Sequence, residues 1–120
     1  MFEFHNDEHH DIQGVIMKYA ILQQGDCLHI VLSERLTYAD HIIFRKMLDA
    51  ACSQPPTSCV IDLSNLDFID STGMGMLVLS ADVARKGGFS LTLAGARGIV
   101  RRALEVAELS RIIPMDEVSG

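Results

Sequence analysis

At 120 residues, the chain has the length of a single domain with one hydrophobic core. Hydrophobic residues make up 48% of it and charged residues 22%, which is typical of globular rather than disordered proteins. The net charge of -6 argues against a nucleic-acid-binding surface, whose affinity comes mainly from lysines and arginines that neutralise phosphates. Cys27, Cys52 and Cys59 lack the spacing of a metal site, so we interpret them as small apolar residues of a reduced protein.

The first residues, MFEFHNDEHHDIQG, are acidic and polar, lack periodicity and do not resemble a signal peptide. We interpret residues 1–14 as a flexible leader and residues 15–117 as the folded domain. His5, His9 and His10 could bind a metal, but nothing fixes the ligand geometry, so we expect a solvated tail with no metal and no cofactor. No apolar run reaches the roughly 18–20 residues that span a membrane. We therefore expect a cytoplasmic protein without direct membrane insertion.

The first half of the domain combines strands with one helix. Apolar and polar residues alternate over residues 17–23 and 27–33, which predicts two strands. A helix follows, and its start is marked by Thr37 and Asp40, which have the spacing of a capping box. Residues 59–63, CVIDL, form a nearly continuous apolar run, as expected for a parallel strand buried on both faces.

The second half alternates helices and strands. We predict a helix over residues 72–86, a strand over 89–94, a helix over 97–109 and a short edge strand at 112–113. The last helix is expected to direct one apolar face to the core: Ile99, Val100, Ala103, Leu104 and Ala107. The order β-β-α-β-α-β-α predicts an α/β domain with a mixed four- to five-stranded sheet, helices packed on it and right-handed crossovers.

The stretch FIDSTGMGML, residues 68–77, joins the apolar strand to the following helix. Sites in open α/β sheets gather at the carboxyl ends of strands, and a helix start offers unpaired N–H groups. Ser71 and Thr72 lie where a hydroxyl, or a phosphate on it, would meet those groups. Gly73 and Gly75 are poor helix formers, and we interpret them as keeping side chains away from a bulky group that approaches the backbone.

Two interpretations of this turn remain open. In the first, Asp70 or Ser71 is only the N-cap of the helix, worth about 1 kcal/mol, which leaves the glycines unexplained. In the second, Ser71 is a phosphorylation switch, because a phosphate adds about -1.5 to -2 charges that the helix tolerates and a docked partner does not. We expect no enzyme activity and no catalytic residue. The turn lacks the frame of a serine hydrolase, the lysine of a P-loop and the spacing of an aspartic protease.

The helix after the turn carries two apolar stripes. One is expected to face the core: Met74, Leu77, Val78, Ala81 and Ala84. The other consists of Met76, Leu79 and Val83, at i, i+3 and i+7. Either the helix is buried on two sides, or this second stripe is a partner-binding face that begins one turn from Ser71.

The segment DLSNLDFIDSTGMGMLVLSADVARKGGFSLTLAG, with its DSTGMG turn, resembles the core of a STAS domain of the anti-sigma factor antagonist family. The likeness extends from about residue 15 to 117 and implies the STAS fold. It also implies that Ser71, between Asp70 and Thr72, accepts phosphate from a serine kinase that is itself the anti-sigma factor, and that a PP2C-type phosphatase removes it. The protein would then regulate transcription by partner switching, binding an anti-sigma factor or similar signalling partner only while Ser71 is unphosphorylated.

The resemblance also locates partner-binding residues. In the family, the loop after the second strand lies near the phosphoacceptor, so Thr37, Tyr38 and Asp40 are expected at the partner surface. Many members carry Gly-x-Leu-Asp in this loop, where residues 34–37 here read Glu-Arg-Leu-Thr. This departure bears on the kind of partner more than on the fold. Because similar domains are accessory subunits of ABC-type lipid transporters, a constitutive subunit of that type is the alternative function.

Overall fold

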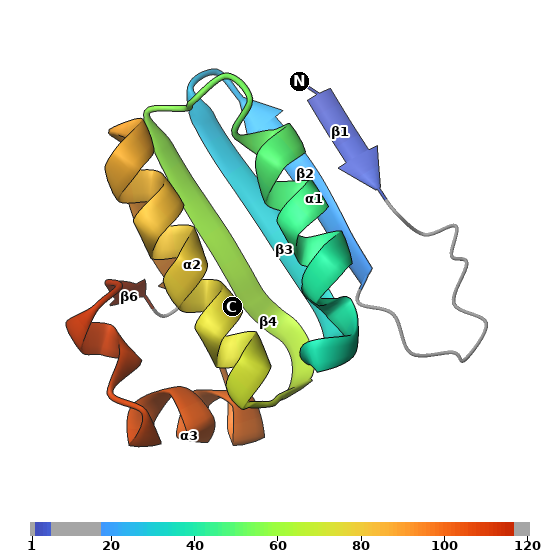
Figure 1. Ribbon diagram of the computed structural model, residues 1–120, viewed down its shortest axis with the longest axis vertical. Coiled ribbons are helices and arrows are strands. Elements are labelled where there is room, and N and C mark those ends of the chain that lie inside the picture. Colours follow the sequence, from blue (N-terminus) through green and yellow to red (C-terminus); the bar gives the residue numbers. More distant parts are fainter. Residues whose placement is uncertain (1, 6–17, 117–120) are drawn as a thin grey trace.

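The computed structural model describes residues 2–5 and 18–116. Their strands form one mixed sheet in the order β1-β2-β3-β4-β5-β6 (Figure 1). β2 pairs antiparallel with both β1 and β3, whereas the pairs from β3 to β6 are parallel. The strands are β1 (Phe2–His5), β2 (Lys18–Gln24), β3 (Cys27–Leu36), β4 (Ser58–Ile69), β5 (Ser90–Ala94) and β6 (Met115–Asp116).

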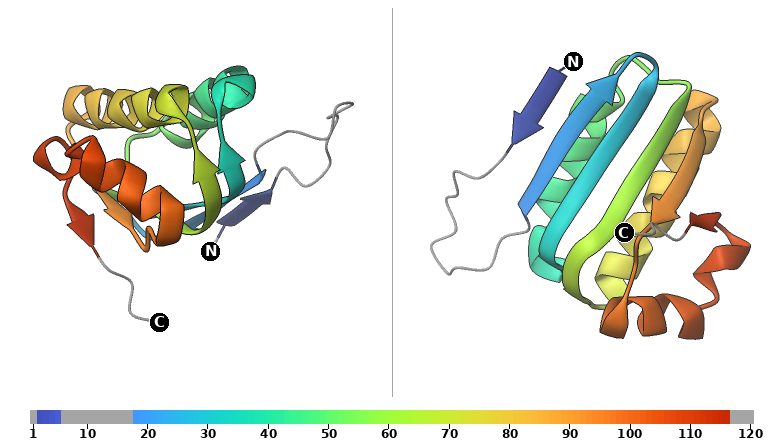
Figure 2. Two further views of the ribbon diagram at one scale, coloured as in Figure 1. Left: turned by 90° about the horizontal axis from the view of Figure 1, so that it is seen from below. Right: turned by 180° about the vertical axis from the view of Figure 1, so that it is seen from behind.

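Of the three α-helices in the described residues, α1 (His41–Ala51) and α2 (Ser71–Gly87) lie side by side on one face of the sheet (Figure 1). The third, α3 (Gly98–Val106), lies beside the carboxyl end of β4. Short 3-10 helices, η1 (Tyr38–Asp40) and η2 (Leu109–Arg111), precede α1 and follow α3. Figure 2 shows the opposite face of the sheet, which none of the described helices covers. No helix in the described part of the chain is long and apolar enough to span a membrane.

The core lies between the sheet and the helices. Alternate residues of β3 and β4 are buried because successive side chains of a strand point to opposite faces. Their buried side chains meet those of the amphipathic helices, which removes apolar surface from water and stabilises the domain. Fully buried large side chains include Ile30, Leu32, Phe44, Met47, Ile61, Leu63, Leu77 and Leu104.

The predicted α/β fold class is confirmed, with differences at both edges of the sheet. Residues 2–5, expected in a flexible leader, form β1, because their backbone pairs with residues 20–23 of β2. The rest of that leader lies outside the described residues. The expected edge strand at 112–113 is wrong: β6 begins after Pro114, whose carbonyl accepts the hydrogen bond of the Leu93 N–H. Ile113 is buried instead.

The last helix also differs from the prediction. It ends at Val106 rather than at 109, because Glu108 takes a left-handed conformation with φ 55° and starts η2. Val100 and Leu104 are buried as expected, but Ile99 is 63% exposed. The buried stripe is therefore narrower than predicted, and an isoleucine at the start of α3 remains in solvent.

Candidate functional site

Asp70 is the N-cap of α2. Its backbone is extended, with φ -104° and ψ -177°, and its Oδ1 accepts a hydrogen bond from the Gly73 N–H at 2.7 Å. Asp70, not Ser71, therefore has the capping role, because its side-chain oxygen satisfies an N–H of the first helical turn. Ser71 is then the first helical residue, and its hydroxyl is not needed as a cap.

The second oxygen of Asp70 joins two helix starts. Oδ2 accepts a hydrogen bond from the Tyr38 N–H at 3.1 Å, and the Asp70 N–H donates to the Leu36 carbonyl at 3.3 Å. The loop after β3 is thereby fixed against the loop after β4. Both loops follow parallel neighbouring strands, whose carboxyl ends meet at one edge of the sheet, here called the carboxyl edge.

The two glycines of the turn have different environments. A Cβ on Gly73 would lie 2.2 Å from the Leu36 carbonyl oxygen and 2.8 Å from Ile69 Cγ1, so the packing of α2 against β3 and β4 requires glycine there. A Cβ on Gly75 would meet nothing within 4 Å, and Gly75 is exposed. The interpretation that both keep the approach of an external group clear is therefore wrong for Gly73, which makes room for the chain itself.

The two hydroxyl residues also differ. Ser71 is exposed at the carboxyl edge, whereas Thr72 is half-buried. Ser71 lies at the N-terminus of a 17-residue helix, where the macrodipole amounts to about half a positive charge. An anionic group on Ser71 would sit in a favourable field of α2 while remaining open to solvent and to other proteins.

The predicted partner-binding residues in the loop before α1 differ in their exposure to solvent. Thr37 donates hydrogen bonds from its N–H (2.8 Å) and its hydroxyl (3.2 Å) to Asp40 Oδ2. Asp40 is completely buried, so the expectation that it contacts a partner is wrong: its carboxylate closes the capping box. Tyr38 is 65% exposed and stacks on His41 with ring centroids 4.9 Å apart.

The departure from the family pattern at residues 34–37 leaves the backbone in a glycine-like conformation. Glu34 has φ 72°, in the left-handed region, at the position where the family pattern has glycine. The register of β3 against β4 shifts between Glu34 and Arg35, which marks a β-bulge. The Glu34 side chain forms a 3.2 Å ion pair with Lys18 on β2.

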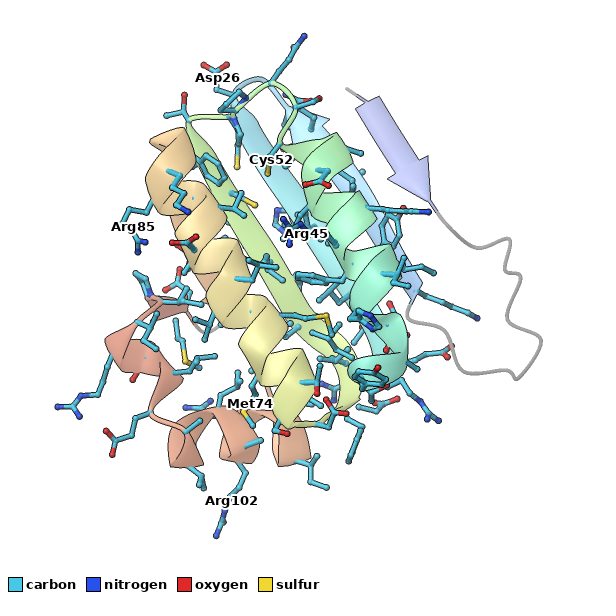
Figure 3. All side chains as sticks on the ribbon, in the orientation of Figure 1. Asp26, Arg45, Cys52, Met74, Arg85 and Arg102 are labelled. Carbon is cyan, nitrogen blue, oxygen red and sulfur yellow. The ribbon has the colours of Figure 1, made fainter. Side chains whose placement is uncertain are left out.

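The second apolar stripe of α2 is only partly accessible. Met76 is 6% exposed and belongs to the core, so its predicted role as a partner contact is wrong. Leu79 and Val83 are half-buried and pack against the same core. At Met76, the second stripe of α2 is therefore buried as well as the stripe that contains Leu77. Met74, labelled in Figure 3, points from the first turn of α2 toward α3 and is half-buried.

Three exposed apolar side chains at the carboxyl edge were not predicted as site residues. Ile42, in the first turn of α1, is 58% exposed, Ile99 63% and Phe68, near the end of β4, 46%. Phe68 and Arg35 line a shallow hollow of about 570 Å³ together with Glu34 and Asp67. An apolar residue on the polar side of a helix or at a strand end was the available signal in the sequence.

Outside this edge, we considered the cysteine thiols as nucleophiles and the histidine, cysteine and acidic side chains as metal ligands. The three cysteines are free, and burial raises the pKa of the Cys59 thiol to about 12 and also raises the pKa of Cys52. Both thiols therefore stay protonated near neutral pH and are poor nucleophiles. Within the described residues, no three His, Cys, Asp or Glu side chains gather to hold a metal. His9 and His10 lie outside those residues.

The sequence of residues 18–119 matches the STAS domain family. A STAS-domain containing protein of Pseudomonas aeruginosa (strain UCBPP-PA14) is 28% identical over 88 residues, which cover 73% of this chain and 86% of that protein. The fold is similar to that of an anti-sigma factor antagonist from Mycobacterium paratuberculosis, with a TM-score of 0.74, 20% identity and coverage of 83% of this chain and 85% of that one.

Two further solved structures share the fold. A sulfate transporter family protein from Wolinella succinogenes gives a TM-score of 0.68 at 16% identity, covering 79% of this chain and 80% of that one. The Bacillus cell fate determinant SpoIIAA in its phosphorylated form gives 0.65 at 16% identity, covering 84% and 91%. The fold thus occurs in both regulators and transporters. Since the STAS family match spans nearly all of the described residues, this chain belongs to the STAS domain family and resembles anti-sigma factor antagonists.

Proposed function

We propose that the protein is a phosphorylation-switched regulator of the anti-sigma factor antagonist type. It binds an anti-sigma factor or similar signalling partner while Ser71 is unphosphorylated and releases it after phosphorylation. One observation carries this proposal: Asp70 supplies the cap of α2 and leaves Ser71 exposed at the first helical position. The fold relative SpoIIAA, which has been solved in a phosphorylated form, supports the same role for this chain.

The physical basis of the switch is a difference in solvation. A phosphate on exposed Ser71 keeps its water and lies in the favourable field of the α2 N-terminus, so the fold tolerates about -1.5 to -2 added charges. A partner docked over Ser71 would have to strip that water. A thousandfold loss of affinity corresponds to about 4 kcal/mol, which one desolvated phosphate can supply.

The family relationship supports the identity of the modifying enzymes. We infer that a serine kinase, itself the anti-sigma factor, phosphorylates Ser71 and that a PP2C-type phosphatase reverses the reaction. Tyr38, whose N–H donates to the Asp70 carboxylate, and Thr37, the residue before it, are the adjoining partner contacts. Leu79 and Val83 are half-buried, so only the exposed part of each side chain contributes to the partner contact. The domain itself acts by binding, without a catalytic step.

The test is a comparison of baits in an extract of the cells that make the protein. Ser71→Ala imitates the unmodified state and Ser71→Asp adds a negative charge. Ser110→Asp adds the same charge at an exposed position in η2. Bound proteins are quantified by mass spectrometry. We expect a signalling protein with an ATP-dependent kinase domain on the Ser71→Ala and Ser110→Asp baits, with recovery at least tenfold lower on Ser71→Asp.

Two results would contradict the switch. Equal recovery of that kinase on all three baits would show that charge at residue 71 does not control binding. Recovery of the same transporter ATPase and permease on all three would support the alternative of a constitutive subunit of an ABC-type lipid transporter.

A further inference from the structure

The environment of Gly75 offers no internal reason for glycine. Gly75 lies inside α2, it is exposed, and a Cβ at this position would meet nothing within 4 Å. Glycine is among the least favourable residues in a helix interior, and alanine among the most favourable. A side chain at residue 75 would therefore stabilise the folded chain. We infer that the reason for glycine lies outside the chain.

Gly75 lies on the same side of α2 as Ser71. Residues four positions apart in an α-helix are neighbours on its surface, so Gly75 follows Ser71 one turn along the exposed side. Gly73 is two positions away, about 200° around the helix axis, and it faces Leu36. Ser71 and Gly75 therefore form a strip of α2 that has little or no side-chain bulk over the backbone.

Exposed apolar side chains are also concentrated at the carboxyl edge, where α2 begins. Of the six large hydrophobic residues that are exposed in the described part of the chain, four are Tyr38, Ile42, Phe68 and Ile99. They come from η1, from the first turns of α1 and α3 and from the end of β4, which meet at that edge (Figure 1). Such a concentration of exposed apolar residues is typical of a protein–protein interface.

We propose that the regulatory partner packs an uncharged, apolar surface directly against the backbone of α2 at Gly75. Tyr38, Ile42 and Ile99 are large hydrophobic side chains exposed to water, and covering them favours an apolar partner surface. This inference rests on the proposed function and adds the point of closest contact and the chemistry of the partner. It also accounts for the switch, since a phosphate one turn away would enter an apolar, desolvated contact.

The experiment begins with stability, which needs no partner. Gly75→Ala should raise the thermal midpoint by about 3–5 °C, as expected for the helix propensity difference in a domain of this size. A midpoint equal to or below that of the wild type would overturn the inference, because glycine would then serve the fold itself.

The second arm measures binding to the protein that is recovered with the wild-type chain and then purified. Isothermal titration calorimetry compares Gly75→Ala, Gly75→Leu, Ser71→Asp and the control Ser110→Leu, which adds the same side chain at an exposed position of η2. We expect Gly75→Ala to weaken binding about three- to tenfold and Gly75→Leu at least 100-fold, with Ser110→Leu within twofold of wild type. Circular dichroism and the thermal midpoint show whether Gly75→Leu is folded.

The outcomes separate the two proposals. If Ser71→Asp abolishes binding and Gly75→Leu does not, the contact at Gly75 is wrong and the switch stands. If Gly75→Leu abolishes binding and Ser71→Asp does not, the contact stands and the switch is wrong. If Gly75→Leu turns a dimer of this chain into a monomer in light scattering, the apolar surface belongs to a second copy, and the inference of a separate partner is overturned.

Discussion

The inner and outer sides of the first turn of α2 use the same residue type for opposite purposes. Gly73 lies on the inner side, where the carbonyl of Leu36 leaves no room for a Cβ, while Gly75 lies on the outer side in open space. Their separation by two residues, about 200° of rotation, produces this difference. A glycine in a motif therefore has no single meaning: its role depends on which side of the helix it occupies.

The same contrast applies to the polar residues of the two helix starts. Asp40 and Asp70 both accept backbone N–H hydrogen bonds, and they fix the loops before α1 and α2. Their neighbours Tyr38 and Ser71 are exposed. The two carboxylates thus position the exposed groups, and substitutions should affect stability on the inner side and binding on the outer side.

The strongest way to test this division is Gly73→Ala. Its Cβ would approach a backbone oxygen that cannot rotate away, so α2 would have to move from β3. We expect the free energy of unfolding to fall by about 3 kcal/mol, at the upper end of overpacking effects. Urea denaturation measures it, with Gly75→Ala as the matched control. A loss below about 0.5 kcal/mol for Gly73→Ala would remove the distinction between the two sides.

A smaller effect is expected for Asp70→Ala, which removes both hydrogen bonds of the carboxylate while adding no bulk. The free energy of unfolding should fall by about 1–2 kcal/mol, as for the loss of an N-cap. Asp70→Asn, which keeps one acceptor oxygen, should lose about half of that. Equal stability of Asp70→Ala and wild type in the same urea experiment would mean that the link between the two helix starts contributes nothing.

The smallest effect is expected at Glu34, in the bulge of β3 that precedes Leu36, the neighbour of Gly73. Glu34→Gly relieves the left-handed conformation and should raise the free energy of unfolding by about 0.5–1 kcal/mol. The lost ion pair with Lys18 is exposed and contributes little. Glu34→Ala is the control, since it removes the ion pair but keeps the Cβ, and it should not be more stable than wild type. If both variants are equally stabilised, the gain does not come from the backbone conformation.

Sequence reasoning succeeded where a local pattern has one physical meaning. Period-two alternation in β3 specified a strand and its buried face, because this pattern follows from backbone geometry. It failed where burial depends on a neighbour distant in the chain. Met76 is covered by the core and Ile99 is not, and neither outcome follows from the composition of its own helix.

The sequence by itself determined the order of elements, the parallel core of the sheet and the place of Ser71 between a strand and a helix, since these depend on hydrophobic periodicity and turn chemistry over a few residues. Only the tertiary structure decided that Asp70 is the cap, that Asp40 and Met76 are inaccessible and that Gly73 serves packing while Gly75 faces solvent. The physical reason is that burial and the room for a Cβ depend on neighbours distant in the chain: Gly73 meets the end of β3, which the sequence separates from α2 by more than thirty residues.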